Sequence, residues 1–389
     1  MLTGLDVLVA TRFRALRGKR VGLVCNPTAV DRELRHAADL LHGAAGVTLS
    51  LLFGPEHGVR GDAQYMAAVG DERDRATGVP VRSLYGATAD SLRPRAGDLA
   101  SLDVLVFDVQ DVGARYYTYQ ATMMLCMEAA AAAKVAFAVL DRPNPIGGAL
   151  VEGPALRPGF ESFCGLHDLA PRHAMTVGEL AELFRVERKL DLDLAVVRCE
   201  GWRRELGFRE TGLPWVFPSP NMPTPETALV YPGMCLLEGT NLSEGRGTTR
   251  PFELFGAPWL DGARLAADLA RERLPGVRFR PASFVPTWDK HAGARCGGVE
   301  LFVLDREAFR PFRTGLACVV AARAQDPEKF RWRTEAYEYV EGVPAFDLLC
   351  GSAREREAIE RGAGARELAQ AFAPEERAFG RRRRRYLLY

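Results

Sequence analysis

LLFGPEHGVRG, at residues 51–61, is the part of the sequence that most constrains the architecture. The apolar run 49–53 predicts a buried strand, and Gly54-Pro55 ends it because neither residue suits the middle of a sheet. Open α/β sheets bind their ligands at the carboxyl ends of the strands, so we expect a site at this turn. The alternative is that this turn is simply exposed to solvent and binds no ligand. The ionisable side chains of the turn are Glu56, His57 and Arg60.

Apolar strands alternate with helices on both sides of this stretch. Further strands are predicted at 20–25, 79–84, 102–109 and 135–140, with helices at 32–41 and 119–133. Such alternation is typical of a parallel sheet covered on both faces. The predicted fold class is therefore α/β with a Rossmann-like parallel sheet. From residue 260 onward, helices and strands alternate again in a second α/β layer.

The sheet lacks the fingerprints of nucleotide-binding proteins. No Gly-x-Gly-x-x-Gly follows the first strand and no Gly-x-x-x-x-Gly-Lys-Ser/Thr occurs in the chain, so we expect no nicotinamide or nucleoside triphosphate cofactor. The eight cysteines form no Cys-x-x-Cys pair, and the six histidines show no His-x-x-x-His spacing. Neither a metal site nor any other cofactor is therefore predicted.

Composition and charge narrow the possible partners and the compartment. The 389 residues suggest two domains, and a net charge of +1 gives no general attraction to nucleic acid or to anionic membranes. No apolar segment is long enough to span a bilayer. Residues 1–20 lack the pattern of a secretory signal, and scattered buried thiols suit a reducing compartment. We therefore expect a cytoplasmic protein, and the sequence indicates no oligomeric state.

Polar side chains stand at the ends of several predicted strands. Because the carboxyl ends of parallel strands meet at one rim of a sheet, we expect these groups to converge there. They are Asn26, Glu56, Asp108, Asp111, Asp141 and Asn144.

Two later loops carry groups that suit a binding cleft. The proline-rich segment 213–225 cannot form a helix or a central strand, so it is either an interdomain linker or an ordered cleft wall that presents Asn221. The loop 238–253 combines glycines with Arg246 and Arg250, a pattern that can hold a carboxylate. A flexible surface loop is the alternative.

Five motifs together resemble the exo-β-N-acetylmuramidase family NamZ, formerly a family of unknown function. They are GPEHG (54–58), FDVQDVGARYYTY (107–119), DRPNP (141–145), PSPNMPT (218–224) and EGTNLSEGRGT (238–248). The resemblance extends from about residue 18 to the end of the chain. It implies a Rossmann-like catalytic domain at 1–226 and a smaller C-terminal α/β domain at 227–389 that completes the substrate cleft. The implied activity is release of terminal N-acetylmuramic acid from the non-reducing end of peptidoglycan fragments.

Glu56, beside His57, is the general acid that this resemblance and the turn both favour. Glycoside hydrolysis needs a carboxylic acid to protonate the leaving oxygen, and partial burial can raise a glutamate pKa for that role. The second catalytic group is open. The acetamido oxygen of the substrate can serve as the nucleophile, oriented by Asp108, Asp111 or Glu152. Structural roles are the alternative: Asp108 could cap the next element, and Glu152 could pair with an arginine.

Recognition of muramic acid requires a group that binds its lactyl carboxylate, and the arginine fork suits this best. We assign this role to Arg246 ahead of Arg250. The alternative is that these arginines pair with Glu244 and Glu253. The full set of predicted substrate-binding residues is Asn26, Arg60, Asp111, Arg115, Tyr116, Tyr117, Asn144, Asn221, Asn241, Glu244, Arg246 and Arg250.

Two other classes of protein stay open at this point. A metal-dependent hydrolase would use His57 with Asp108 and Asp111, and a strong chelator would abolish its activity. A non-enzymatic saccharide- or muropeptide-binding protein with two α/β lobes would need no catalytic acid.

Overall fold

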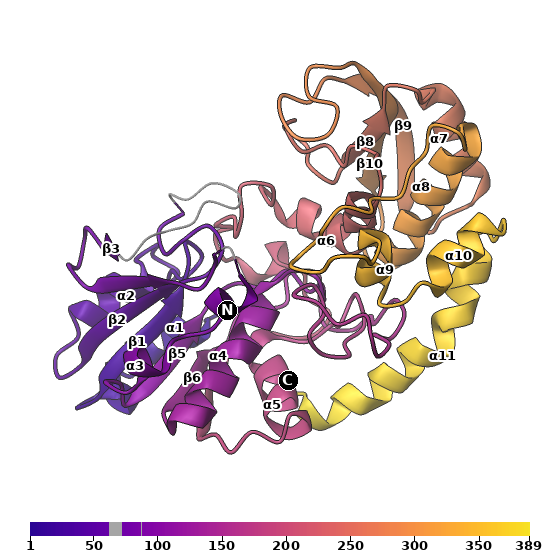
Figure 1. Ribbon diagram of the computed structural model, residues 1–389. Coiled ribbons are helices and arrows are strands. Elements are labelled where there is room, and N and C mark those ends of the chain that lie inside the picture. The colour runs from indigo at the N-terminus through magenta and orange to yellow at the C-terminus, as the bar shows by residue number, and fades with distance from the viewer. Residues whose placement is uncertain (62–71, 87) are drawn as a thin grey trace.

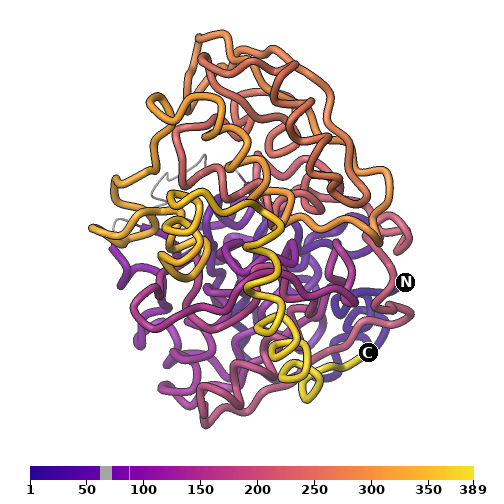
Figure 2. The backbone as a smooth tube through the Cα atoms, turned by 90° about the vertical axis from the view of Figure 1, so that its right-hand side faces the viewer, coloured from indigo at the N-terminus to yellow at the C-terminus, as the bar shows by residue number. Residues whose placement is uncertain are grey.

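The computed structural model describes residues 1–61, 72–86 and 88–389 (Figure 1). One lobe is built on a seven-stranded sheet and the other on a three-stranded sheet. The long helix α11 (Ala365–Arg383) leaves the second lobe and runs back along the first, beside which the chain ends (Figure 2). Within the described ranges, no helix is both long and apolar enough to cross a membrane.

The seven-stranded sheet has the order β3-β4-β2-β1-β5-β6-β7. All neighbouring strands are parallel except β3 and β4. This arrangement confirms the predicted α/β class with a mainly parallel sheet. The strands are β1 (Arg20–Cys25), β2 (Thr48–Gly54), β3 (Glu72–Arg73), β4 (Pro80–Ser83), β5 (Val104–Asp108), β6 (Ala136–Leu140) and β7 (Leu194–Val197).

Alternate side chains of the central strands lie in two separate cores, because successive residues of a strand point to opposite faces. Val24 and Phe53 belong to the core that also contains Met123 of α4 and Leu180 of α5. Leu23 belongs to the other core, together with the buried side chains of α1 and α2. The helices of this lobe are α1 (Gly4–Ala10), α2 (Ala37–His42), α3 (Ala96–Leu99), α4 (Tyr119–Ala133) and α5 (Val177–Glu187).

Helix α2 begins five residues later than the predicted range 32–41, at Ala37. The carboxylate of Asp31 accepts the backbone N–H groups of Glu33 and Arg35 at 3.0 and 2.9 Å. Leu34 has a φ of 63°, in the left-handed region, and its side chain is exposed. The segment is therefore a turn, because a side-chain acceptor competes with the helical hydrogen bonds.

The second lobe contains an antiparallel sheet of order β8-β10-β9, packed against helices. Its strands are β8 (Leu254–Ala257), β9 (Val277–Phe284) and β10 (Cys296–Val303). Its helices, besides α11, are α6 (Pro225–Met234), α7 (Gly262–Arg271), α8 (Pro311–Gln325), α9 (Ala345–Cys350) and α10 (Arg354–Glu360). Short 3₁₀ helices occur along both parts of the chain. They are η1 (Arg14–Leu16), η2 (Ala89–Leu92), η3 (Arg209–Thr211), η4 (Cys235–Gly239) and η5 (Arg384–Tyr386).

Helices α6 and α8 touch through backbone atoms at two glycines. A Cβ atom on Gly233 would lie 1.8 Å from the carbonyl oxygen of Pro311, and one on Gly315 would lie 2.0 Å from the carbonyl oxygen of Gly233. Only glycine permits this approach. Since η4 follows α6 directly, the contact also fixes the position of Glu238 near the end of η4.

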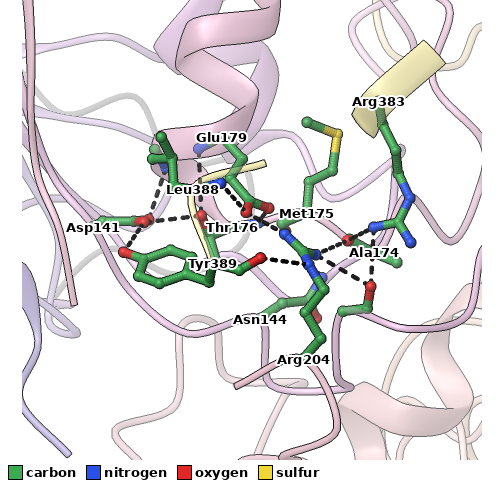
Figure 3. Close-up of polar contacts among 12 residues, drawn as sticks. Asp141, Asn144, Ala174, Met175, Thr176, Glu179, Arg204, Arg383, Leu388 and Tyr389 are labelled. Atoms are coloured by element: carbon green, nitrogen blue, oxygen red, sulfur yellow. Dashed lines mark hydrogen bonds and ion pairs between the residues drawn. The ribbon is translucent and has the colours of Figure 1, made fainter. Parts of the chain in front are cut away.

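The C-terminal residues bind the carboxyl end of the first sheet (Figure 3). The hydroxyl of Tyr389 donates to Asp141 Oδ2 at 2.7 Å, and Thr176 Oγ1 donates to the same oxygen at 2.9 Å. The backbone N–H of Leu388 donates to Glu179 Oε1 at 2.8 Å. Thr176 and Glu179 also form the capping box that starts α5. Asp141, a strand-end group expected at the site, is therefore engaged by structural contacts.

Candidate active site

A cavity with about 590 Å³ of empty space, part of it open to solvent, is lined by both lobes. The earlier part of the chain contributes Glu56, His57, Tyr116, Tyr117, Thr118, Tyr119, Ser219, Asn221 and Met222. The later part contributes Tyr231, Glu238, Arg246, Phe252, Tyr337 and Glu338. Among the predicted site residues, the cavity thus brings together Glu56, His57, Tyr116, Tyr117, Asn221 and Arg246.

Glu56 enters the cavity from the turn that follows β2. The backbone N–H of Gly58 donates to the carbonyl of Pro55 at 2.9 Å, and His57 adopts a left-handed φ of 72°. Such a conformation is costly for a residue with a side chain and is concentrated at functional sites. Nε2 of the buried His57 lies 4.0 Å from Glu56 Oε1. Burial raises the pKa of Glu56 to about 7, with Arg246 opposing this rise and Glu238 adding to it.

A cluster of tyrosines forms one wall of the cavity and joins it to the proline-rich segment. The ring centroid of Tyr117 lies 5.1 Å from that of Tyr119 and 5.5 Å from that of Tyr231, in edge-to-face contacts. The hydroxyl of Tyr119 donates to the carbonyl of Pro218 at 2.6 Å and lies 3.3 Å from the carbonyl oxygen of Glu56. One hydroxyl therefore couples the segment 213–225 to the Glu56 turn.

Arg246 reaches the cavity within a network of ion pairs. Its Nη2 binds Glu238 Oε1 at 2.7 Å, and its Nε lies 3.0 Å from Glu244 Oε1. Lys290 Nζ binds the other oxygen of Glu244 at 3.0 Å. Glu244 thus holds Arg246 rather than facing the cavity. Arg250, which is 46% exposed, pairs with Glu253 at 3.0 Å. These ion pairs are the expected alternative to carboxylate binding, and the lactyl-binding role of Arg246 stays a prediction.

Glu338 also lines the cavity and was not predicted as a site residue. It lies in a two-residue turn between Tyr337 and Val340, whose backbones exchange two hydrogen bonds of 3.0 Å. The sequence around it, RTEAYEYVEG at 333–342, has neither strand nor helix periodicity. Its local signal is a glutamate between two tyrosines, which by itself indicates no site.

Three predicted catalytic or orienting carboxylates do not line the cavity. Asp108 is fully buried and binds Arg142 through both oxygens, at 2.5 and 3.0 Å. Asp111 accepts the N–H of Gly113 at 2.6 Å and lies 3.3 Å from Nε2 of the buried His173.

Glu152 is the third of these carboxylates. Its Oε1 accepts the backbone N–H of Arg313 at 2.9 Å, and burial raises its pKa to about 7. Its backbone exchanges hydrogen bonds of 3.1 and 3.0 Å with Arg172. This carboxylate therefore connects elements within the fold, and its catalytic role stays a prediction.

Arg60 and Arg115, both predicted to bind substrate, have structural partners outside the cavity. Arg60 forms bidentate ion pairs with Asp39 and Asp74. Arg115 is fully buried and donates to the carbonyl oxygens of Leu169 and Leu349 at 2.9 and 2.7 Å. Residues far apart in sequence thus meet at Arg115.

Three predicted asparagines also serve backbone segments. Asn26 Oδ1 accepts from Thr28, and Asn144 Nδ2 donates to the carbonyl of Met175 at 3.0 Å. Asn241 Nδ2 donates to the carbonyl of Lys329 at 2.9 Å. Local turn chemistry explains Asn26, because an asparagine at a strand end readily caps the following backbone. The side-chain amide nitrogens of Asn144 and Asn241 instead bind backbone segments that are distant in sequence. Sequence position alone does not separate that role from ligand binding.

Potential metal ligands are not grouped anywhere in the part of the chain that the structure describes. All eight cysteines are buried free thiols, in keeping with the scattered buried thiols that the sequence predicts. The lining residues present carboxyl, hydroxyl, amide and guanidinium groups to the cavity, and these groups suit proton transfer to a polar organic ligand.

Two family models match nearly the whole chain. The model described as "Exo-beta-N-acetylmuramidase NamZ, N-terminal" matches residues 21–226, and the corresponding C-terminal model matches residues 229–389. The chain is 46% identical over 387 residues to a protein of Bacillus subtilis (strain 168) named peptidoglycan beta-N-acetylmuramidase NamZ. That alignment covers 100% of this chain and 91% of the relative.

Two crystal structures of DUF1343 family proteins from Bacteroides fragilis NCTC 9343 have the same fold. The first has a TM-score of 0.91 at 36% identity, and the second a TM-score of 0.80 at 30% identity. Each alignment covers 100% of this chain and 98% of the other. The two-lobed arrangement is thus shared with experimentally determined structures.

Proposed function

Because the chain belongs to the exo-β-N-acetylmuramidase NamZ family, we propose that it is a glycosidase with Glu56 as its general acid. Family membership confirms the resemblance that the sequence motifs indicated. The proposed reaction removes one N-acetylmuramic acid residue from the non-reducing end of a peptidoglycan fragment. We further propose that residues 1–226 form the catalytic domain and that 227–389 complete the substrate cleft, which is supported by the cavity lining from both parts.

The observation that carries the assignment is the environment of Glu56. Its side chain is 17% exposed, lines the cavity and has a pKa of about 7 because of burial. A carboxylic acid with this pKa is still partly protonated at neutral pH and can donate its proton to a leaving oxygen. His57, whose backbone has a left-handed φ of 72°, places its Nε2 4.0 Å from Glu56 Oε1.

The proposed first step uses the acetamido group of the substrate as the nucleophile. The acetamido carbonyl oxygen bonds to the anomeric carbon, the glycosidic C–O bond breaks, and Glu56 transfers its proton to the departing oxygen. In the second step, water bonds to the anomeric carbon and gives a proton back to Glu56, and the acetamido oxygen leaves. Two displacements at one carbon return the original anomeric configuration.

The proposed compartment is the cytoplasm, where soluble peptidoglycan fragments would be met during cell wall recycling. Eight buried free thiols support a reducing environment, since oxidising compartments favour disulfides.

The test is incubation with a β-1,4-linked N-acetylmuramyl-N-acetylglucosamine disaccharide, with products read by mass spectrometry. We expect equimolar free N-acetylmuramic acid and N-acetylglucosamine, with the β-anomer of muramic acid seen first by NMR. Binding of the disaccharide without cleavage would instead identify a saccharide-binding protein. First appearance of the α-anomer would contradict acetamido participation while leaving the hydrolase assignment in place.

A further inference from the structure

The turn that carries Glu338 has an unusual backbone. Both of its central residues, Glu338 and Tyr339, have left-handed φ angles, 47° and 67°. Tight hairpins of this kind normally use glycine, asparagine or aspartate at these positions. A glutamate–tyrosine pair here costs conformational energy, so surrounding contacts must hold it.

Tyr337 and Tyr339, on either side of Glu338 in the sequence, supply those contacts. The hydroxyl of Tyr337 donates to Glu238 Oε2 at 2.9 Å. The hydroxyl of Tyr339 donates to the carbonyl of Gly86 at 2.9 Å, and its ring lies edge-on to Tyr85 at 6.3 Å between centroids. The backbone on either side of Glu338 is thus fixed by one contact to each lobe. These two contacts hold Glu338 at the cavity.

The carboxyl group of Glu338 has unused hydrogen-bonding capacity. Its Oε2 is buried and has no hydrogen-bond partner among the described residues. Burial raises the pKa of Glu338 to about 8; Glu56 and Glu238 add to this rise, while Arg333 and Arg246 oppose it. A buried polar atom without a partner is destabilising, and at a ligand site the ligand can supply the missing bond.

Of the three carboxyl groups that line the described cavity, Glu338 is the one left for a second role. Glu56 is the proposed acid. Both oxygens of Glu238 are engaged, one by Arg246 and one by Tyr337. Although burial alone would raise the pKa of Glu238, the Arg246 ion pair outweighs it and lowers that pKa. Glu238 therefore stays an ionised structural partner.

We propose that Glu338 is the second carboxyl group of the reaction, and that its Oε2 accepts the N–H of the substrate's 2-acetamido group. This proposal rests on the proposed function. The N–H donor supplies the partner that Oε2 lacks, and hydrogen bonding to a carboxylate favours its ionised form. As the acetamido oxygen bonds to the anomeric carbon, positive charge develops on the amide nitrogen and its proton moves toward Glu338. The proton returns to nitrogen when water opens the ring.

The experiment compares Glu338→Gln, Glu56→Gln and Glu341→Gln on two substrates. Glu341 is an exposed glutamate three residues from Glu338 and serves as the matched control. One substrate is the N-acetylmuramyl disaccharide, whose leaving group needs a proton, and the other is 4-nitrophenyl β-N-acetylmuraminide, whose leaving group does not. Circular dichroism and the melting temperature check that each variant folds. If the Glu338→Gln variant does not fold, Glu338→Asp is measured in its place.

We expect Glu338→Gln to lower kcat by about 10²-fold or more on both substrates, as does loss of a group that stabilises developing charge. Glu56→Gln should lose about 10²-fold on the disaccharide and far less on the nitrophenyl glycoside. Glu341→Gln should match wild type. Wild-type rates for Glu338→Gln on both substrates would overturn the proposal, as would a loss confined to the disaccharide. Failure of the wild-type enzyme on both substrates would instead reject the proposed function.

Discussion

Arg246 and Glu238 form a 2.7 Å ion pair at the wall of the cavity, where the side chain of Arg246 is 14% exposed and that of Glu238 is 10% exposed. Removal of one partner from a buried ion pair leaves an uncompensated charge and typically costs about 3–5 kcal/mol. Replacing Arg246 with an uncharged residue would therefore disturb folding and specificity together. A substitution that keeps the positive charge allows the effect on specificity to be measured apart from the effect on folding.

Arg246→Lys should lower the preference for N-acetylmuramic acid over N-acetylglucosamine substrates. Lysine keeps the positive charge for Glu238 and Glu244 but lacks the planar fork that binds a carboxylate bidentately. We expect kcat/KM on the muramyl disaccharide to fall about tenfold, equivalent to ~1.4 kcal/mol, with little change on the glucosaminyl analogue. A parallel fall on both substrates would show that Arg246 acts through its ion pairs alone.

The raised pKa of Glu56 should make stability depend on pH. Because the folded-state pKa of about 7 lies above the unfolded value, the contribution of Glu56 to stability is fully present below the unfolded pKa and is lost as the pH rises through 7. The Glu56→Gln variant has no ionisable carboxyl group at this position, so its stability lacks this pH-dependent loss. Urea unfolding should find the variant more stable than wild type by on the order of 2–3 kcal/mol at pH 8, with a much smaller difference at pH 4.5. An equal difference at both pH values would contradict the raised pKa.

Tyr389→Phe should destabilise the protein without changing KM. The Tyr389 hydroxyl donates to the buried Asp141 and accepts the backbone N–H of Cys199 at 2.7 Å. Its loss should cost about 1–3 kcal/mol in urea unfolding, the range for unsatisfied buried groups. The control is Tyr386→Phe, whose hydroxyl contacts the less buried Glu187 at 3.2 Å. Equal effects of the two substitutions would argue against a special role for the Asp141 contact.

Tyr119→Phe should loosen the proline-rich segment. Its hydroxyl binds Pro218 and lies next to the Glu56 backbone, so the variant should be cut faster by protease within 213–225 and should lose about tenfold in kcat/KM. Tyr389→Phe, the same chemical change far from the cavity, is the control. Unchanged proteolysis and activity would show that the segment is held by other contacts.

Local chemistry explains which parts of this account were predictable. The strand ended by Gly54-Pro55 is encoded in neighbouring residues and occurs as predicted. The turn at Leu34 was missed because Asp31 replaces helical hydrogen bonds with its carboxylate. That competition depends on side-chain geometry that hydrophobic spacing does not reveal.

The active site was only partly predictable for a different reason. Glu56 follows a recognisable strand end, whereas Glu338 is positioned by Tyr337 and Tyr339, whose partners lie in distant segments. Asp108 and Asp111 lie at the expected rim of the sheet. However, Asp108 pairs with Arg142, and Asp111 contacts His173. Tertiary partners, which no local pattern specifies, decide whether a strand-end carboxylate faces a ligand or stabilises the fold.

The most direct test of the central claim measures turnover of the N-acetylmuramyl disaccharide by wild type and Glu56→Gln under identical conditions. The amide keeps the shape of the side chain and removes its acidic proton. The account predicts release of N-acetylmuramic acid by wild type and a loss of about 10²-fold or more in kcat for the variant, with the melting temperature at neutral pH no lower than that of wild type. Turnover by the folded variant within a few-fold of wild type would contradict the assignment of Glu56 as the general acid.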